Sequence, residues 1–264
     1  MGRVARALIL HEFLERTRDR WVMVISVVFA LLASAVSLYG RGAEAEVAKL
    51  TGPSLVTLAS LFAPLVAMVL SHDAIVGERE RNTLGLLLSL PVSRLEVVVA
   101  KYLGRALALS LAIGLGIGAA IAVSGGEGAA ALTRLVGPTL LLGLAFLSIG
   151  MLISACTRRQ ATAASIVVVV WFGLVFFFDL GLLAMLVLSD GAVPQQVIAS
   201  LLLGNPAGLY RLQMMQTFAG PEVLSELGMT AALPGAGVIA LLWGAWLVLP
   251  NLASGLLLAR EKAP

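Results

Sequence analysis

The sequence is poor in charge, in cysteine and in histidine. Charged residues make up 12% of the 264 residues, roughly half the share found in soluble domains. Cys156 is the one cysteine, which excludes an internal disulfide and a cysteine metal cluster. His11 and His72 are the only histidines, and neither has a second histidine at helical spacing, so the zinc pattern H-E-x-x-H is absent. We therefore expect no metal site.

Several motifs of enzymes are also missing. The phosphate-binding pattern G-x-x-x-x-G-K-[ST] and the hydrolase pattern G-x-S-x-G do not occur, and the apolar runs hold no pair of aspartates. Gly114, Gly116 and Gly118 form GxGxG inside an apolar run, where small residues indicate close helix packing rather than a nucleotide site. The chain is therefore not expected to be an enzyme.

What the sequence has in abundance is apolar residues, at 59% of the chain, with a mean hydropathy of +0.99. This composition predicts an all-α protein that crosses a membrane several times, because only helices and closed barrels satisfy their backbone groups in lipid. Each predicted span has 18 or more mainly apolar residues, enough to cross roughly 30 Å of hydrocarbon. The six predicted spans are 22–39, 54–71, 103–123, 135–156, a run that starts near Gln160, and 235–258.

The distribution of Lys and Arg predicts the orientation of these spans. If both termini lie in the cytoplasm, 14 of the 18 basic residues fall in inside segments and 4 in outside segments. This asymmetry is typical of membrane proteins, and it explains the pI of 9.4 without a nucleic-acid partner. No cleavable signal peptide is expected, because the first apolar run is long enough to be a span.

Two segments outside the spans have helical patterns. Residues 1–21 carry five arginines and apolar residues at helical spacing, which predicts an amphipathic helix on the inner membrane surface with Trp21 at the headgroups. The outer segment 190–234 contains apolar patches broken at Asn205-Pro206, Gly220-Pro221 and Pro234. We expect short helices there, folded against the outer rim.

Residues 71–105 form the longest charged interruption in the first half of the chain. A charged run at 78–81 precedes an apolar run, Pro91 breaks the chain, and Ser93 with Glu96 forms a capping-box pattern for the next helix. Simple connections take about 2–8 residues, whereas this one takes about 30 with helical periodicity. It suits docking onto a soluble partner, and the alternative is a solvated connection.

The order of residues in this segment resembles the cytoplasmic loop of ABC-2 type transporter permeases: Glu80, Thr83-Leu84, an apolar run, Pro91, Ser93 and Lys101. In that family the loop carries the coupling helix that plugs into an ATPase subunit. Many members place glycine just before the Thr-Leu pair, where this chain has Arg81-Asn82. The resemblance covers the whole chain and implies one transmembrane domain over 1–264, with an interfacial helix at 1–21, a coupling loop at 72–102 and an outer loop at 190–234. The residues that it implies for coupling are Glu78, Glu80, Thr83, Leu84, Leu87, Leu88, Pro91 and Ser93.

A narrower resemblance rests on three stretches: Trp171-Phe172 to Asp179-Leu180, Asn205-Pro206 with Tyr210-Arg211, and Trp243 to Pro250. They are similar to the permease subunit of the transporter that supports maturation of the copper enzyme nitrous oxide reductase. This implies no directly bound cofactor, ATP and Mg on a partner ATPase, and a bacterial or archaeal cytoplasmic membrane. The implied partners are the ATPase, a second copy of the chain, a periplasmic β-helical protein, a copper chaperone and the lipid bilayer.

Four residues near the outer side are candidates for a partner surface or a substrate path: Asp179, Asn205, Pro206 and Arg211. Asp179 is 19 residues beyond Gln160, roughly 28 Å along a helix. A helix cap at the interface and a role in a substrate path both remain open for it. Met214, Met215 and Met229 could bind Cu(I) or pack as flexible apolar side chains.

Three functions remain open. The chain could transmit the work of an ATPase for nitrous oxide reductase maturation. It could instead export another substrate, such as a drug, lipid, ion or haem, as ABC-2 relatives do. A passive membrane scaffold that needs no ATPase is the third.

Overall fold

The computed structural model describes residues 2–18, 51–123, 126–218 and 234–261, together with short pieces between 26 and 38. Half of the predicted first span at 22–39, Trp21 and the part of the outer segment at 219–233 therefore lie outside the described residues. The described residues are helical and contain no strand. The helices are α1 (Arg3–Thr17), α4 (Thr51–Ser71), α5 (Val76–Glu80), α6 (Leu84–Leu88), α7 (Arg94–Val123), α8 (Gly126–Cys156), α9 (Gln160–Phe172), η1 (Gly173–Phe177), α10 (Phe178–Leu188), α11 (Gln195–Gly204), α12 (Pro206–Phe218) and α14 (Ala236–Ala259).

Among the described residues, five helical stretches are long and apolar enough to cross a membrane. They are Gly52–Glu80, Arg94–Val123, Leu132–Cys156, Gln160–Leu188 and Ala236–Ala259. These correspond to five of the six predicted spans, so the chain is a multi-pass, all-α membrane protein. The helices begin and end a few residues away from the predicted boundaries, because hydropathy marks the apolar run and not the caps that end a helix.

The helix α8 lies at the centre of the bundle, where it packs against α4, α7, α12 and α14. In its most apolar window 67% of the residues are buried, compared with 17% in the peripheral stretch Gln160–Leu188. Small residues permit the close approach of neighbours: a Cβ on Gly150 would lie 1.9 Å from the Ser71 hydroxyl oxygen of α4. Such contacts hold helices together in lipid, where the hydrophobic effect between spans is weak.

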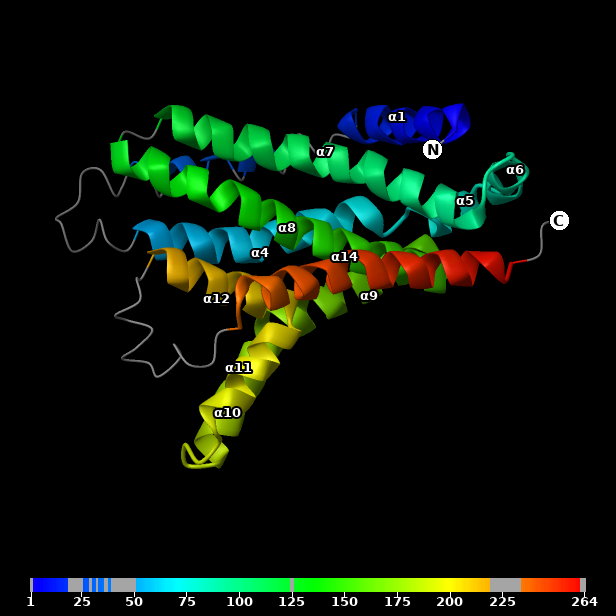
Figure 1. Cartoon of the computed structure of the whole chain (residues 1–264). Coiled ribbons are helices and arrows are strands. Elements are labelled where there is room, and N and C mark those ends of the chain that lie inside the picture. Colours follow the sequence, from blue (N-terminus) through cyan, green and yellow to red (C-terminus); the bar gives the residue numbers. More distant parts are fainter. Residues whose placement is uncertain are drawn as a thin grey trace.

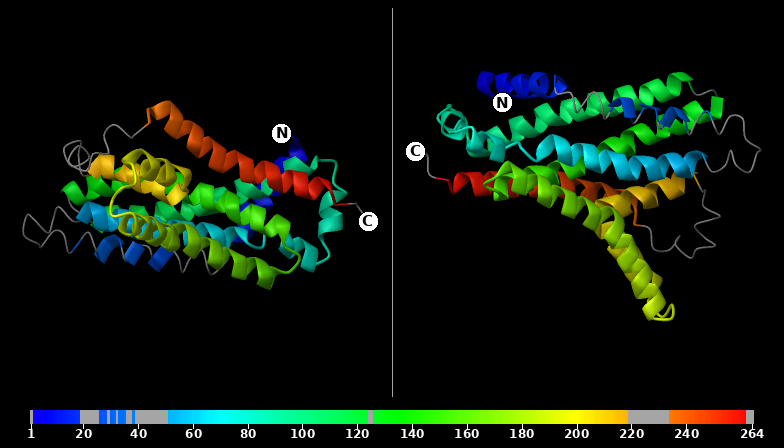
Figure 2. Two further views of the ribbon diagram at one scale, coloured as in Figure 1. Left: turned by 90° about the horizontal axis from the view of Figure 1, so that it is seen from below. Right: turned by 180° about the vertical axis from the view of Figure 1, so that it is seen from behind.

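The two ends of the bundle differ. One end carries α1, α5, α6 and the C-terminus, and we call it the α6 end (Figure 1). The α6 end is also where α8 finishes, at Cys156, and where α9 begins, at Gln160. The last turns of α7 and α12 and the first turns of α8 lie toward the opposite end (Figures 1 and 2).

The stretch Gln160–Leu188 is bent. Its middle is the π-helix η1, Gly173–Phe177, and a π-helical turn is a common cause of a kink. Beyond η1, α10 turns away from the bundle and pairs with α11 as a hairpin that projects from its side (Figures 1 and 2). The aromatic rings of Trp171, Phe172 and Phe176 pack against one another around this bend.

The helices described within 190–234 are α11 and α12, and α12 lies elsewhere than predicted. The sequence correctly predicted a break at Asn205-Pro206 with a helix on each side, α11 before it and α12 after it. However, α12 runs beside α4 and α8 and is part of the bundle rather than a cover on its rim (Figure 1). The Tyr210 hydroxyl lies 3.2 Å from that of Thr139, both side chains being fully buried. Polar partners on other helices, which the local sequence pattern does not reveal, draw α12 into the bundle.

We expect Gly150→Ala to destabilise the protein by about 1–3 kcal/mol, because overpacking at a tight helix contact forces backbone shifts. Gly137→Ala in the same helix is the matched control, since nothing lies within 4 Å of its added Cβ. It should leave thermal unfolding in detergent unchanged or slightly raise the midpoint. Equal midpoints for the two variants would contradict the packing of α8 on α4.

Candidate functional site

The candidate site at the α6 end is built on the turn between α5 and α6. The amide of Thr83 donates to the carbonyl of Glu78 at 3.0 Å, and that of Asn82 donates to Arg79 at 3.1 Å. This is the Schellman arrangement, which needs a left-handed residue after the helix. Asn82 supplies it with φ 57°. After glycine, asparagine is the residue that most often adopts this conformation. Asn82 can therefore occupy the position before Thr83 where many members of the family have glycine.

Hydrogen bonds hold α5 against the ends of the spans. The Arg79 guanidinium donates to the carbonyls of Ala155 at 2.9 Å and Ser154 at 3.2 Å, and it also contacts the carbonyl of Thr157. These are carbonyls at the C-terminus of α8, which would otherwise lack partners. Arg79 also pairs with Glu261, which follows α14. Arg79 therefore fixes α5 to the C-terminal ends of α8 and α14.

Two other groups complete this support. The Ser154 hydroxyl accepts hydrogen bonds from the amides of Ile75 at 2.9 Å and Val76 at 3.1 Å, at the start of α5. The predicted coupling residue Glu80 accepts a hydrogen bond at 2.8 Å from the amide of Gln160, the first residue of α9. The segment before α6 is thus connected to α8, α9 and α14.

The apolar side chains of α6 point in two directions. Leu88 is buried, and Leu84 and Leu87 pack against the same small core, which includes Ile75 and Leu258. Leu86, which was not among the predicted coupling residues, is 73% exposed. The three leucines predicted for coupling, Leu84, Leu87 and Leu88, therefore also hold α6 against the bundle. The leucine that α6 presents to solvent is Leu86.

The turn after α6 contains the predicted Pro91 and Ser93, and both are exposed. Ser93 caps α7: its hydroxyl accepts from the amide of Glu96 at 3.2 Å, and its own amide donates to the Glu96 carboxylate at 2.9 Å. The predicted capping box is therefore confirmed. The Arg94 guanidinium donates to the carbonyl of Leu88 at 2.8 Å, which connects the start of α7 with the end of α6.

A group of buried charges beneath α5 and α6 was missed by the sequence reasoning. Its members, called the charge cluster below, are Glu12, Arg16, Asp73, Glu78, Lys101 and Arg105. Four of them form a ring. The Arg105 guanidinium contacts Glu12 at 2.6 Å and Asp73 at 2.5 Å, and that of Arg16 contacts Asp73 at 2.8 Å and Glu12 at 3.8 Å.

The other two members form a branch. Lys101 Nζ lies 3.0 Å from Glu12 and 2.8 Å from Glu78, which also accepts a hydrogen bond from the Thr83 hydroxyl. Three carboxylates and three cations balance, so the cluster is neutral. Burial alone raises the pKa of Glu12, but Arg105 and Lys101 outweigh it and hold that pKa below its usual value. Glu12 is thus ionised at neutral pH.

The sequence did contain a signal for the charge cluster. Glu12 and Arg16 are four residues apart, as are Lys101 and Arg105, so each pair shares one helix face. Counting basic residues for orientation assigned each cation to one side of the membrane and did not consider whether it is buried. Arg105, however, is 1% exposed, and a buried cation requires carboxylate partners.

A hollow of about 280 Å³ lies between α1, α6 and α7. Leu8 and His11 line it from α1, and Leu86 and Leu87 line it from α6. Lys101 and Glu78 of the charge cluster form part of its wall. The hollow combines apolar sides with one charged patch, as sites that receive a side chain from a partner commonly do.

The second group of predicted residues comes together near the bend at η1. Arg211 of α12 forms a two-pronged ion pair with Asp179 of α10, with one contact at 2.9 Å. The Asn205 amide donates at 2.7 Å to the carbonyl of Leu174 within η1. Pro206 is the first residue of α12, where its missing amide hydrogen costs nothing. Asp179, Asn205 and Arg211 therefore connect α12 with the bent span.

The methionines of this region separate. Met214 is 3% exposed and packs in the main core, which agrees with apolar packing. Met215 is half-buried, and Met229 lies outside the described residues.

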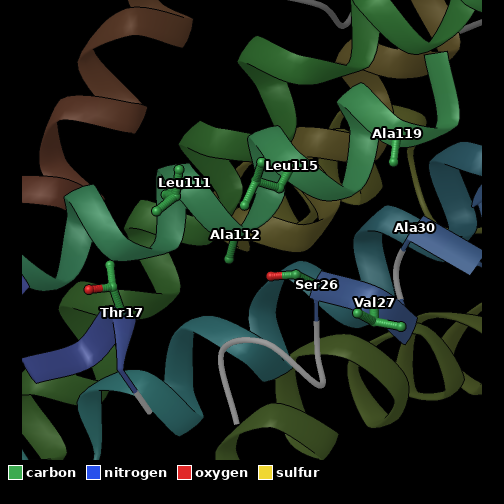
Figure 3. A pocket seen from close by; sticks show the side chains of 8 residues that line it. All are labelled: Thr17, Ser26, Val27, Ala30, Leu111, Ala112, Leu115 and Ala119. Atoms are coloured by element: carbon green, nitrogen blue, oxygen red, sulfur yellow. The ribbon is translucent and has the colours of Figure 1, made fainter. Parts of the chain in front are cut away.

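An apolar cleft of about 400 Å³ lies between α7 and the described pieces at 26–30. Figure 3 shows Leu111 and Leu115 of α7 on one side of it, with Ser26 and Val27 on the other. Most of its lining is hydrocarbon. The hydroxyl groups that line it among the described residues belong to Thr17 and Ser26, and none of the residues of the candidate site reaches it.

The comparison with known families identifies the class of protein. The profile described as ABC-2 family transporter protein matches residues 6–262. The chain therefore belongs to the ABC-2 family of transporter permeases.

Two curated relatives are more specific. The probable ABC transporter permease protein NosY of Pseudomonas aeruginosa is 36% identical over 235 residues, which cover 84% of this chain and 86% of the relative. The protein of the same name from Stutzerimonas stutzeri is 36% identical over 250 residues, covering 89% and 91%. The resemblance inferred from the sequence is thus confirmed at the level of the family and of NosY-like permeases.

The pairing of Asp179 with Arg211 predicts a stability effect. Arg211→Gln leaves the Asp179 carboxylate without its cation, and we expect a loss of about 1–3 kcal/mol. The double variant Asp179→Asn/Arg211→Gln removes both charges and should regain most of that loss. Thermal unfolding in detergent measures both, and a single variant as stable as the wild type would show that the pair is unimportant.

Proposed function

We propose that this chain is the membrane subunit that couples ATP hydrolysis by a separate ATPase to transport or to force transmission. The α6 end then faces the cytoplasm with both termini, and α1 lies at the membrane surface. Residues 72–102 form the coupling loop and 190–234 the outer loop of one domain over 1–264. Two copies would form the working unit, each with one ATPase that binds ATP and Mg.

The observation that carries this proposal is the way α6 is held. Its backbone follows a segment that is hydrogen-bonded to the ends of α8 and α9, and its inner leucines are packed. Leu86 nevertheless remains 73% exposed at the surface. A large exposed leucine on a firmly supported short helix suits insertion into an apolar groove of a partner.

The hollow beside α6 supports the same proposal. Its wall includes Leu8 of α1 and Leu86 of α6, so one partner surface can touch both elements. The missing phosphate-binding motif in the sequence gives a reason for such a partner. We propose that Glu80 and Thr83 lie in the same contact area, with Pro91 and Ser93 setting the angle between α6 and α7.

The narrower proposal is a role in the maturation of nitrous oxide reductase. It rests on the resemblance of three stretches of the sequence and on the name of two relatives, which are 36% identical over most of the chain. The complex would then include a periplasmic β-helical protein and a copper chaperone on the outer side. In this proposal the region around Asp179 and Arg211 is the surface on which outer partners or substrate act.

Leu86→Asp tests the docking surface. Because a carboxylate replaces an exposed leucine, folding should be unaffected while copurification of the ATPase falls at least tenfold, a change of about 1.4 kcal/mol in binding. Leu188→Asp is the matched control, since Leu188 is 85% exposed and lies at the far end of α10. It should keep the ATPase. An intact complex in Leu86→Asp would sink the docking assignment.

Deletion of the gene in its native host tests the narrower role. We expect the cells to produce nitrous oxide reductase with little copper, measured as metal per purified enzyme. The wild-type gene should restore the copper and Leu86→Asp should not. Fully loaded enzyme in the deletion strain would favour an exporter of another substrate. Restoration by Leu86→Asp, with no ATPase in the purified complex, would favour a passive scaffold.

A further inference from the structure

The charge cluster separates into two parts with different electrostatic requirements. In the ring, Glu12 and Asp73 are balanced by Arg16 and Arg105, so the ring is neutral by itself. Lys101 and Glu78 add one further positive and one further negative charge. Neutrality of the ring does not demand this second pair, so it needs another explanation.

The location of the second pair suggests one. Lys101 belongs to α7, and its Nζ bridges Glu12 of α1 and Glu78 of α5 at 3.0 Å and 2.8 Å. Glu78 in turn accepts a hydrogen bond from Thr83, the residue that directly precedes α6. An unbroken series of polar contacts therefore leads from the start of α6 to a membrane-spanning helix.

Burial along this series is graded. The Lys101 side chain is 7% exposed and that of Glu12 is 4% exposed, whereas the Glu78 side chain is 22% exposed. Separation of Lys101 from the buried Glu12 would leave charges without partners in a site of low polarity, which is costly. The contact between Glu78 and Lys101 lies at the more exposed end of the series, next to α6, where a movement of α6 arrives first.

Space for such a movement exists at the same place. The hollow of about 280 Å³ includes Glu78, Lys101 and Thr83 in its lining. Because the hollow separates parts of α1 and α6, α6 can shift relative to α1 without an immediate clash. The Lys101 side chain, with four methylenes, can follow Glu78 over a short distance.

We propose that the Glu78–Lys101 ion pair, beside the Arg94–Leu88 hydrogen bond between α6 and α7, is a link that transmits movement of α6 to α7 and also to α1. This deepens the proposed coupling to an ATPase and rests on it. Glu78 and Lys101 are positioning residues: the partner contacts α6, and the pair passes the displacement to the span. The ring holds α1 to α7, so that both move together.

The chain offers a matched control for this link. Glu15 of α1 and Arg81, which follows α5, also form an ion pair between these elements, at 3.6 Å. Their side chains are 40% and 56% exposed, and exposed pairs of this kind contribute little. If any ion pair between α1 and this segment were enough, loss of Glu15 would matter as much as loss of Glu78.

The experiment compares Glu78→Gln, Lys101→Met, Lys101→Arg and Glu15→Gln in the complex with its ATPase. For Glu78→Gln and Lys101→Met we expect normal copurification of the ATPase and normal ATP hydrolysis. The copper content of nitrous oxide reductase should fall about tenfold, which is within the range of about 5–150-fold that coupling between two sites commonly produces. Lys101→Arg keeps the charge and should retain most of the copper. Glu15→Gln should behave as the wild type. Glu78→Gln decides the matter if Lys101→Met fails to fold, because Glu78 is less buried.

The variants are compared in a host where deletion of the gene lowers the copper of nitrous oxide reductase. In that host two outcomes would overturn the link alone: full copper loading in Glu78→Gln, or loss of the ATPase from that variant, which would make Glu78 a docking or folding residue. A different result addresses the proposed function. If the wild-type chain brings no ATPase with it, the coupling proposal fails and the link fails with it. The wild-type complex is therefore measured first, in the same preparation.

Discussion

The α6 end depends on the burial of one cation, Arg105. Arg105 belongs to the apolar helix α7 and is 1% exposed. Its positive charge must therefore be balanced by carboxylates of the protein. Glu12 and Asp73 supply carboxylates, and the carbonyl of Leu70 accepts a further hydrogen bond at the end of α4. α1 therefore has to lie directly on α7. Gly104 permits this, since a Cβ there would lie 2.6 Å from Cβ of Glu12 and 2.8 Å from a backbone oxygen of α1.

This requirement decides how α5 and α6 can be held. With Asp73 fixed by the ring, the chain after α4 starts from a defined point, and Ser154 and Arg79 then satisfy backbone groups at the start of α5 and at the end of α8. Orphan carbonyls and amides at helix ends must find partners somewhere. Here the partners of these helix ends lie on the segment that leads to α6. The ends of the spans and the segment that supports the proposed docking surface are therefore joined by the same hydrogen bonds. A displacement of α5 and α6 therefore also displaces the ends of α8 and α9.

Local patterns of the sequence predicted what local physics determines. Apolar run lengths predicted five of the spans, and Ser93 with Glu96 predicted the start of α7, because a span and a capping box are properties of neighbouring residues. Partners far apart in the chain could not be predicted in this way. Glu12 and Arg105 are separated by 93 positions, and Asp179 and Arg211 by 32. Nothing in a single sequence fixes these pairings, which is also why α12 was expected on the rim and the charge cluster was missed.

The polar contacts gather where helices are interrupted. The break after α4 carries the ring and its branch, and the π-helix in the bent span carries Asn205 on the carbonyl of Leu174, with Asp179 and Arg211 just beyond. In lipid an interrupted helix needs side chains that replace lost backbone partners. Those side chains can also exchange partners, whereas an unbroken helix can curve only gently before its backbone hydrogen bonds are lost. In the described part of the chain, these two interruptions are therefore the places where the bundle can change shape at least cost.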